Sequence, residues 1–152
     1  MKNTFDFDRF YELLYVASKN VFSSIQLAHK NESFYIFALY TCGDLGYLLP
    51  TSSTKEGLAL AVEKYSKMAL FNGVSLEKLQ EDLRWSPCDS PLHLEGESHF
   101  NEVSKFISEV PLILEAIPTE ESWDEFEEFF DKFMGVCIEV LKRLDKEGIF
   151  GE

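Results

Sequence analysis

Residues 34–56 have the sequence FYIFALYTCGDLGYLLPTSSTKE, and this stretch decides the fold. An aromatic and apolar run, residues 33–41, is too short for a core helix and is typical of a buried strand. The Gly43–Gly46 segment then supplies turn residues that accept a positive φ. A second strand over residues 47–50 would pair back on the first, and Pro50 would end it. We therefore predict a hairpin over residues 33–50.

Outward from the hairpin, spacing and capping signals predict about four helices. Ser53 and Glu56 match a capping box that begins one helix. Apolar residues at three-and-four spacing predict the others over residues 7–28, 97–110 and 120–146, and Ser75 would cap a further short turn of helix. Residues 83–86 are interpreted as a third short strand, and a helix that ends at Leu83 is the alternative. Together these elements predict one α+β domain over residues 1–152, with a small antiparallel sheet of about three strands.

The composition is that of a folded, intracellular protein. The chain has 152 residues, of which 45% are apolar, so it is long enough to form a core without a metal or disulfide. Three widely spaced cysteines argue against a disulfide framework and indicate a reducing compartment. The N-terminus carries acids where a signal peptide carries basic residues, and no apolar run is long enough to span a bilayer. We expect a cytoplasmic protein.

Charge is unevenly distributed along the chain. The net charge is −13, and residues 77–152 carry all of it, with 20 acids against 7 bases. Nucleic acid and anionic membranes are unfavourable partners for such a surface, because both need clustered Lys and Arg. The acidity favours a basic protein partner, or it serves only to keep a Phe-rich protein soluble. Eight acids between residues 115 and 131 are either a partner surface or a solvated helix face.

Two polar segments form the candidate binding site. Thr41 and Asp44 lie at the predicted hairpin turn, close to the hydroxyl residues 51–53. The second segment, residues 83–97, contributes a guanidinium, an indole and three carboxylates: Arg84, Trp85, Asp89, Glu95 and Glu97. If the two segments meet at one end of the sheet, they form a binding site. The alternative is that Arg84 pairs with an internal acid and Trp85 is buried in the core.

Metal and catalytic motifs are weak. The candidate zinc ligands are Cys42, Cys88, His93 and His99. Only the two histidines are close enough in sequence to resemble a ligand pair, so we expect no metal site. Cys88 with His93, or Ser86 with His99, would be nucleophile–base pairs if the fold joined them. The familiar hydrolase, phosphate-loop and dinucleotide motifs do not occur. We assign no catalytic residue and expect no cofactor.

Three segments together resemble the DUF4303 domain family of uncharacterised bacterial proteins. They are residues 34–58 (FYIFALYTCGDLGYLLPTSSTKEGL), 83–97 (LRWSPCDSPLHLEGE) and 144–151 (LDKEGIFG). The resemblance implies a small α+β protein and an association with immunity-type proteins encoded near bacterial toxins. In longer members, the segment matching residues 148–151 continues into a further strand. The resemblance assigns no catalytic residue.

Three functional hypotheses follow. The first is a non-enzymatic protein-binding module, an immunity-like inhibitor whose acidic half covers a basic toxin. The second is a small hydrolase or ligand-binding enzyme with a polar site between the loops at residues 41–54 and 84–97. The third is a structural dimer that buries the Phe-rich long helix.

Overall fold

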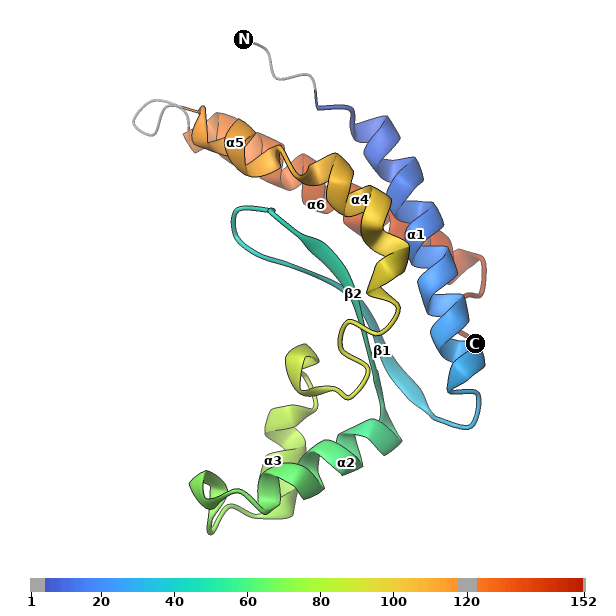
Figure 1. Ribbon diagram of the computed structural model, residues 1–152, viewed down its shortest axis with the longest axis vertical. Coiled ribbons are helices and arrows are strands. Elements are labelled where there is room, and N and C mark those ends of the chain that lie inside the picture. The colour runs from blue at the N-terminus through green and yellow to red at the C-terminus, as the bar shows by residue number, and fades with distance from the viewer. Residues whose placement is uncertain (1–4, 118–122, 152) are drawn as a thin grey trace.

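A two-stranded antiparallel hairpin runs through the middle of the molecule (Figure 1). The computed structural model describes residues 5–117 and 123–151. Strand β1 (Phe34–Thr41) pairs with β2 (Leu48–Thr54), from Phe34 opposite Thr54 to Thr41 opposite Leu48. A register shift between Phe34 and Ile36 interrupts the pairing near the open end of the hairpin. The predicted hairpin and the α+β class are confirmed.

Four helices cover one side of this hairpin. They are α1 (Phe7–Ala28), α4 (Asn101–Ile107), α5 (Val110–Glu115) and α6 (Trp123–Lys146), with the 3₁₀ turn η3 (Glu97–Phe100) leading into α4 (Figure 1). Helix α1 begins where predicted, because the Asp6 carboxylate accepts a hydrogen bond from the Arg9 amide at 2.9 Å. Its apolar stripe is buried along its whole length. Helix α1 is thus the central element of the core.

Aromatic rings join α1 to α6 and to the hairpin. Phe10 and Phe133 stack with centroids 4.5 Å apart, and both side chains are fully buried. Further along α1, Phe22 contacts Phe37 of β1 at 5.3 Å and Phe150 at 5.6 Å. Each buried Phe contributes roughly 1.5–3 kcal/mol by removing apolar surface from water. These contacts hold the two longest helices and the sheet as one layered unit.

A pair of helices stands outside this core. Helices α2 (Lys55–Ser66) and α3 (Leu76–Leu83) project from the open end of the hairpin, with the 3₁₀ turn η1 (Ala69–Phe71) between them (Figure 1). The main apolar cluster contains described residues from every other helix and from both strands, but none from residues 55–86. Within α2 and α3, only Gly57, Ala61 and Leu79 are buried. The molecule is therefore crescent-shaped, with α2 and α3 forming one tip.

The structure corrects three sequence-based predictions. Residues 83–86 do not form a third strand, because α3 runs to Leu83 and a 3₁₀ turn, η2 (Pro87–Asp89), follows; the described residues form two strands. Pro50 does not end β2, since a strand of a two-stranded sheet has a free edge that tolerates a missing N–H. The cap of α2 is Thr54 rather than Ser53, with its hydroxyl accepting from the Gly57 amide at 2.9 Å.

The four predicted helical regions all contain helices, and the structure adds to them. Ser75 caps α3, which is longer than the expected single turn, and α5 forms between the helical regions predicted over residues 97–110 and 120–146. No helix among the described residues is both long enough and apolar enough to cross a bilayer.

Replacing Phe133 with Ala should lower the free energy of unfolding by about 3–5 kcal/mol, because it leaves a cavity between α1 and α6. The matched control is Ile138→Ala on the same helix, where the side chain is 49% exposed; we expect a loss below about 1 kcal/mol. Urea unfolding followed by circular dichroism measures both. Equal losses for the two variants would contradict the central role of the α1–α6 contact.

Candidate functional site

The hairpin turn holds Thr41 and Asp44 in bonds of its own. The Thr41 hydroxyl donates to the Tyr47 carbonyl at 2.5 Å. The Asp44 carboxylate accepts from the Cys42 thiol at 2.6 Å and from the Gly46 amide at 3.0 Å, and these bonds, the thiol's first, lower the pKa of Asp44. The turn lies beside α5, at the closed end of the hairpin (Figure 1). The side chains of these two residues therefore stabilise the turn.

The segment after α3 crosses over β2, as the predicted site requires, but different residues make the contact. The Ser90 hydroxyl donates to the Ser52 carbonyl at 2.6 Å, and Nδ1 of His93 lies 3.2 Å from the Thr51 hydroxyl oxygen. Thr51 and Ser52 are fully buried between this segment and the core. The loops at residues 41–54 and 84–97 thus meet through the hydroxyl residues of β2, not through Thr41 and Asp44.

Asp89 fastens the same segment to α2. Its carboxylate accepts hydrogen bonds from the hydroxyls of Ser86 and Tyr65. Both bonds favour the ionised form, that of Ser86 more strongly, so the pKa of Asp89 lies below its usual range. Asp89 is therefore a structural link between the 3₁₀ turn η2 and α2.

Glu95 takes part in an ionic clamp at the end of α1. The two ring nitrogens of His29 each lie 2.8 Å from a carboxylate oxygen, of Glu32 on one side and of Glu95 on the other. Glu32 also accepts from the Thr54 hydroxyl at 2.5 Å. The clamp therefore ties α1, the start of the hairpin and the 90–96 segment together. Glu97, by contrast, is exposed at the start of η3.

Arg84 and Trp85 meet the opposite end of the hairpin from the turn. The Tyr35 hydroxyl donates to the Arg84 carbonyl at 3.0 Å, and the guanidinium carbon lies 5.2 Å from the Trp85 ring centroid. Trp85 is 67% exposed, so the interpretation of this indole as a core residue is wrong. The seven predicted site residues are thus divided among five places, and no single site unites them.

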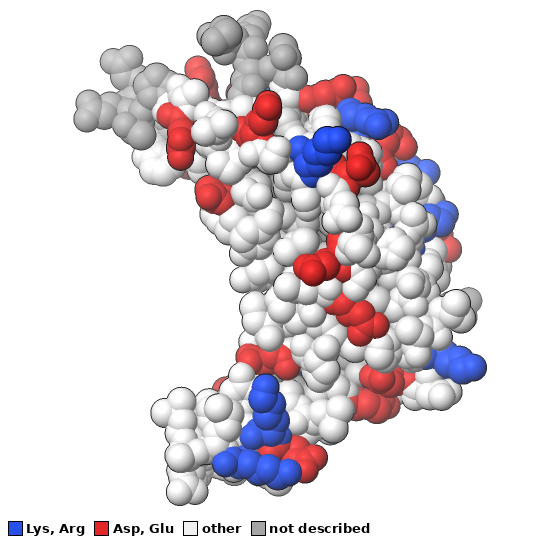
Figure 2. All heavy atoms as spheres, in the orientation of Figure 1, with Lys and Arg blue, Asp and Glu red and all other residues white. Residues whose placement is uncertain are grey.

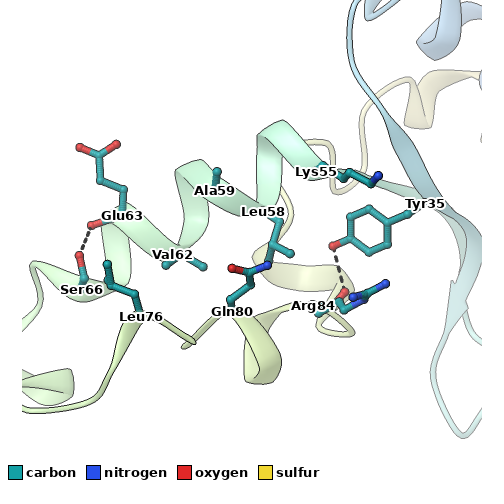
Figure 3. A pocket seen from close by; sticks show the side chains of 10 residues that line it. All are labelled: Tyr35, Lys55, Leu58, Ala59, Val62, Glu63, Ser66, Leu76, Gln80 and Arg84. Carbon is teal, nitrogen blue, oxygen red and sulfur yellow. Dashed lines mark hydrogen bonds between the residues drawn. The ribbon is translucent and has the colours of Figure 1, made fainter. Parts of the chain in front are cut away.

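A groove between α2 and α3 adjoins Tyr35 and Arg84 (Figure 3). Its open volume is about 460 Å³, within the range of ligand pockets. Leu58, Val62 and Leu76 form its apolar middle. Lys55 and Arg84 flank Tyr35 at one end, as Figure 3 shows, and Glu63 and Ser66 lie at the other. Of these lining residues, only Arg84 is among the site residues predicted from the sequence. The signal for the others is the surplus of apolar residues on two short helices.

A second surface is defined by charge. The described part of residues 97–131 holds nine acids and one base, and all ten side chains are exposed. We call the nine acids the acidic surface: Glu97, Glu102, Glu109, Glu115, Asp124, Glu125, Glu127, Glu128 and Asp131. Among the described residues, only Glu128 of this set has a cation in ion-pair range, Lys132 at 2.6 Å. Figure 2 shows acidic side chains over the end of the molecule formed by α4 and α5. Glu120 and Glu121, also in the predicted acidic face, lie outside the described residues.

Two of the four residues weighed as zinc ligands have other partners. The Cys42 thiol bonds to Asp44, and His93 to Thr51, as described above. Over residues 5–117 and 123–151, no three His, Cys, Asp or Glu side chains are grouped closely enough to hold a metal ion.

Comparison with known proteins identifies the family. The model of a domain of unknown function, DUF4303, matches residues 14–152, so nearly the whole chain is covered and the chain belongs to this family. No curated protein and no solved structure matches the chain.

The clamp predicts a pH dependence of stability. Its carboxylates, Glu32 first, raise the pKa of His29 above 6.5, and hydrogen bonds from the Thr54 hydroxyl and then from His29 lower the pKa of Glu32 below 4.5. The histidine contribution is fully present below about pH 6.5 and is lost as the pH rises through the raised value. The Glu32 contribution is present above about pH 4.5 and is lost as the pH falls. The clamp should therefore stabilise the folded state most between about pH 4.5 and 6.5.

The measurement is the free energy of unfolding at about pH 6 and pH 9, for the parent and for His29→Gln. We expect a larger loss on alkalinisation in the parent than in the variant. His99→Gln, at an exposed histidine, is the control and should leave the pH dependence of the parent intact. An identical pH profile for the parent and His29→Gln would contradict the clamp.

Proposed function

We propose that this member of the DUF4303 family is a non-enzymatic protein-binding module that acts as an immunity-like inhibitor of a basic toxin. The observation that carries the proposal is the acidic surface, in which eight of nine exposed carboxylates lack a neighbouring cation among the described residues. Unpaired charge of one sign attracts a partner of the opposite sign over about a Debye length and accelerates association.

Two exposed apolar side chains lie within the acidic surface. Trp123 and Leu112 are 67% and 65% exposed, on α6 and α5 respectively. Trp123 also contacts Phe126 edge-to-face at 5.5 Å, which restricts its ring. Binding energy at protein interfaces concentrates in such aromatic anchors, whereas surrounding charges set orientation and rate. Trp123 is therefore the anchor in our proposal.

The alternative function is a small hydrolase or ligand-binding enzyme. The polar contacts at β2 support this alternative less than the acidic surface supports protein binding. Cys88 and Tyr40 share a hydrogen bond, and bonds from Tyr47 and then Cys88 raise the pKa of Tyr40 to about 12. His93 meets the edge of the Tyr40 ring, and its Nδ1 lies beside Thr51. A nucleophile needs a base within hydrogen-bond reach, and no such Cys88–His93 bond is formed among the described residues. The lining of the groove, moreover, contains none of these groups. We therefore favour a binding function over a catalytic one.

Neutralising the acidic surface should slow association with the toxin. In Asp124→Asn/Glu125→Gln/Glu127→Gln, three charges are lost from the N-terminal half of α6, and we expect an association rate at least about tenfold lower at low salt. The matched control, Glu77→Gln/Glu139→Gln/Asp145→Asn, loses three exposed charges from other parts of the chain and should bind at nearly the parent rate. We expect a basic toxin domain to be encoded beside this gene, and surface plasmon resonance with that domain measures both variants. A gene neighbourhood without such a toxin would contradict the proposal.

Growth rescue tests inhibition itself. Co-expression of the chain with that neighbouring toxin should restore growth, and Trp123→Ala should weaken the rescue. Toxicity unchanged by the parent chain, or binding insensitive to salt between about 50 and 500 mM, would contradict the proposal.

A further inference from the structure

The tip formed by α2 and α3 exposes an unusual share of the apolar side chains. Of the eleven large apolar residues that are exposed in the described chain, six lie between residues 60 and 85: Leu60, Met68, Leu70, Val74, Leu76 and Trp85. Leu70 is 84% exposed. Of these residues, Leu76 lines the groove that opens between the two helices, together with Leu58 and Val62 (Figure 3). An apolar groove in a region with so many exposed apolar side chains is a candidate interaction site.

The groove is an incomplete helical layer. Helices bury their apolar stripes by packing against a neighbouring element. Here α2 and α3 pack on each other and bury Ala61 and Leu79, yet Leu58, Val62 and Leu76 still line open space. From Lys55 to Ser66 the groove follows α2 for about three helical turns, roughly 17 Å at 1.5 Å per residue. A third helix of similar length would complete the layer.

The charge at one end of the groove specifies its occupant. Lys55 and Arg84 flank Tyr35 there, and neither has a carboxylate within ion-pair distance among the described residues (Figure 3). Arg84 instead stacks near the rings of Tyr35 and Trp85, at 5.7 and 5.2 Å. At the other end, Glu63 is already paired with Lys67 at 2.6 Å. The available charge of the groove is therefore positive, on a chain whose net charge is −13.

We propose that the groove binds an acidic amphipathic helix of a partner protein. The apolar face of that helix covers Leu58, Val62 and Leu76, and a carboxylate near its end meets Lys55 and Arg84. Helix-in-groove recognition uses this combination of an apolar stripe with a flanking charge. This site is separate from the acidic surface and takes a partner segment of the opposite charge.

A membrane is the less favoured occupant of the same apolar surface. Bilayer-binding tips combine exposed apolar residues with an excess of Lys and Arg. In residues 55–86, five acids balance five bases, so an anionic bilayer gains no net attraction.

The experiment titrates the full-length chain with a synthetic amphipathic peptide of about 16 residues. The peptide has leucines at three-and-four spacing and glutamates at both ends; a matched peptide replaces the glutamates with lysines. Two-dimensional NMR locates binding, and calorimetry measures affinity. We expect shifts confined to the lining of the groove, and at least about threefold weaker binding of the lysine peptide. The acidic-surface triple variant should bind the glutamate peptide as the parent does, which separates this proposal from the proposed function.

Variants test the groove itself. Arg84→Glu should lower the affinity for the glutamate peptide about threefold to tenfold. Lys142→Glu makes the same charge change at an exposed position on α6 and should leave the affinity unchanged. Leu76→Asp, at a 57% exposed side chain, should abolish binding while preserving the thermal midpoint. The proposal is overturned by shifts outside the groove, by equal affinity for both peptides, by no binding at about 1 mM peptide, or by binding to phosphatidylserine vesicles that Leu76→Asp removes.

Discussion

The stacking of Phe10 on Phe133 is the contact on which the rest of the fold depends. It joins the two longest helices, and both rings are fully buried. Once α1 is fixed against α6, the stripe of α1 meets the hairpin through Phe22 and the 96–100 segment through Val21. The latter approach is so close that a Cβ at Gly96 would lie 2.6 Å from the Val21 side chain, and Gly96 has a φ of +74°. Only glycine satisfies both conditions there.

In this arrangement the hydrophobic core forms on one side of the hairpin, between the hairpin and the helices α1, α4, α5 and α6. Helices α2 and α3 lie outside this core. The two ends of the molecule consequently differ in chemistry. Around α4, α5 and the start of α6, the surface is acidic and carries Trp123. At the α2–α3 tip, charges balance and apolar side chains are exposed around a groove. Two surfaces so different suit two different partners, or two segments of one large partner.

Buried hydroxyls explain the largest error of the sequence analysis. Residues 51–54, Thr-Ser-Ser-Thr, have the composition of a polar cap or rim, and their position after Pro50 favours the end of a strand. In the structure they continue β2 and are all buried. Three of their polar groups bond to residues distant in sequence: the Thr54 hydroxyl to Glu32, the Ser52 carbonyl to Ser90 and the Thr51 hydroxyl to His93. The Ser52 hydroxyl, by contrast, is buried without a hydrogen-bond partner among the described residues. Local sequence holds no signal for such partners, because they come from segments that only the fold brings together.

The sequence alone determined α1, the hairpin, the cap of α3 at Ser75 and the concentration of charge in the second half, because each follows from local periodicity, turn chemistry or composition. It also determined the family, through three motif segments that the match over residues 14–152 confirms. The tertiary structure alone decided that Thr41, Asp89 and Glu95 serve structural bonds, that Trp85 is exposed, and that a groove opens between α2 and α3. The physical reason is that periodicity shows which face of a helix is apolar, whereas the competition among elements for one limited core decides which apolar faces are covered.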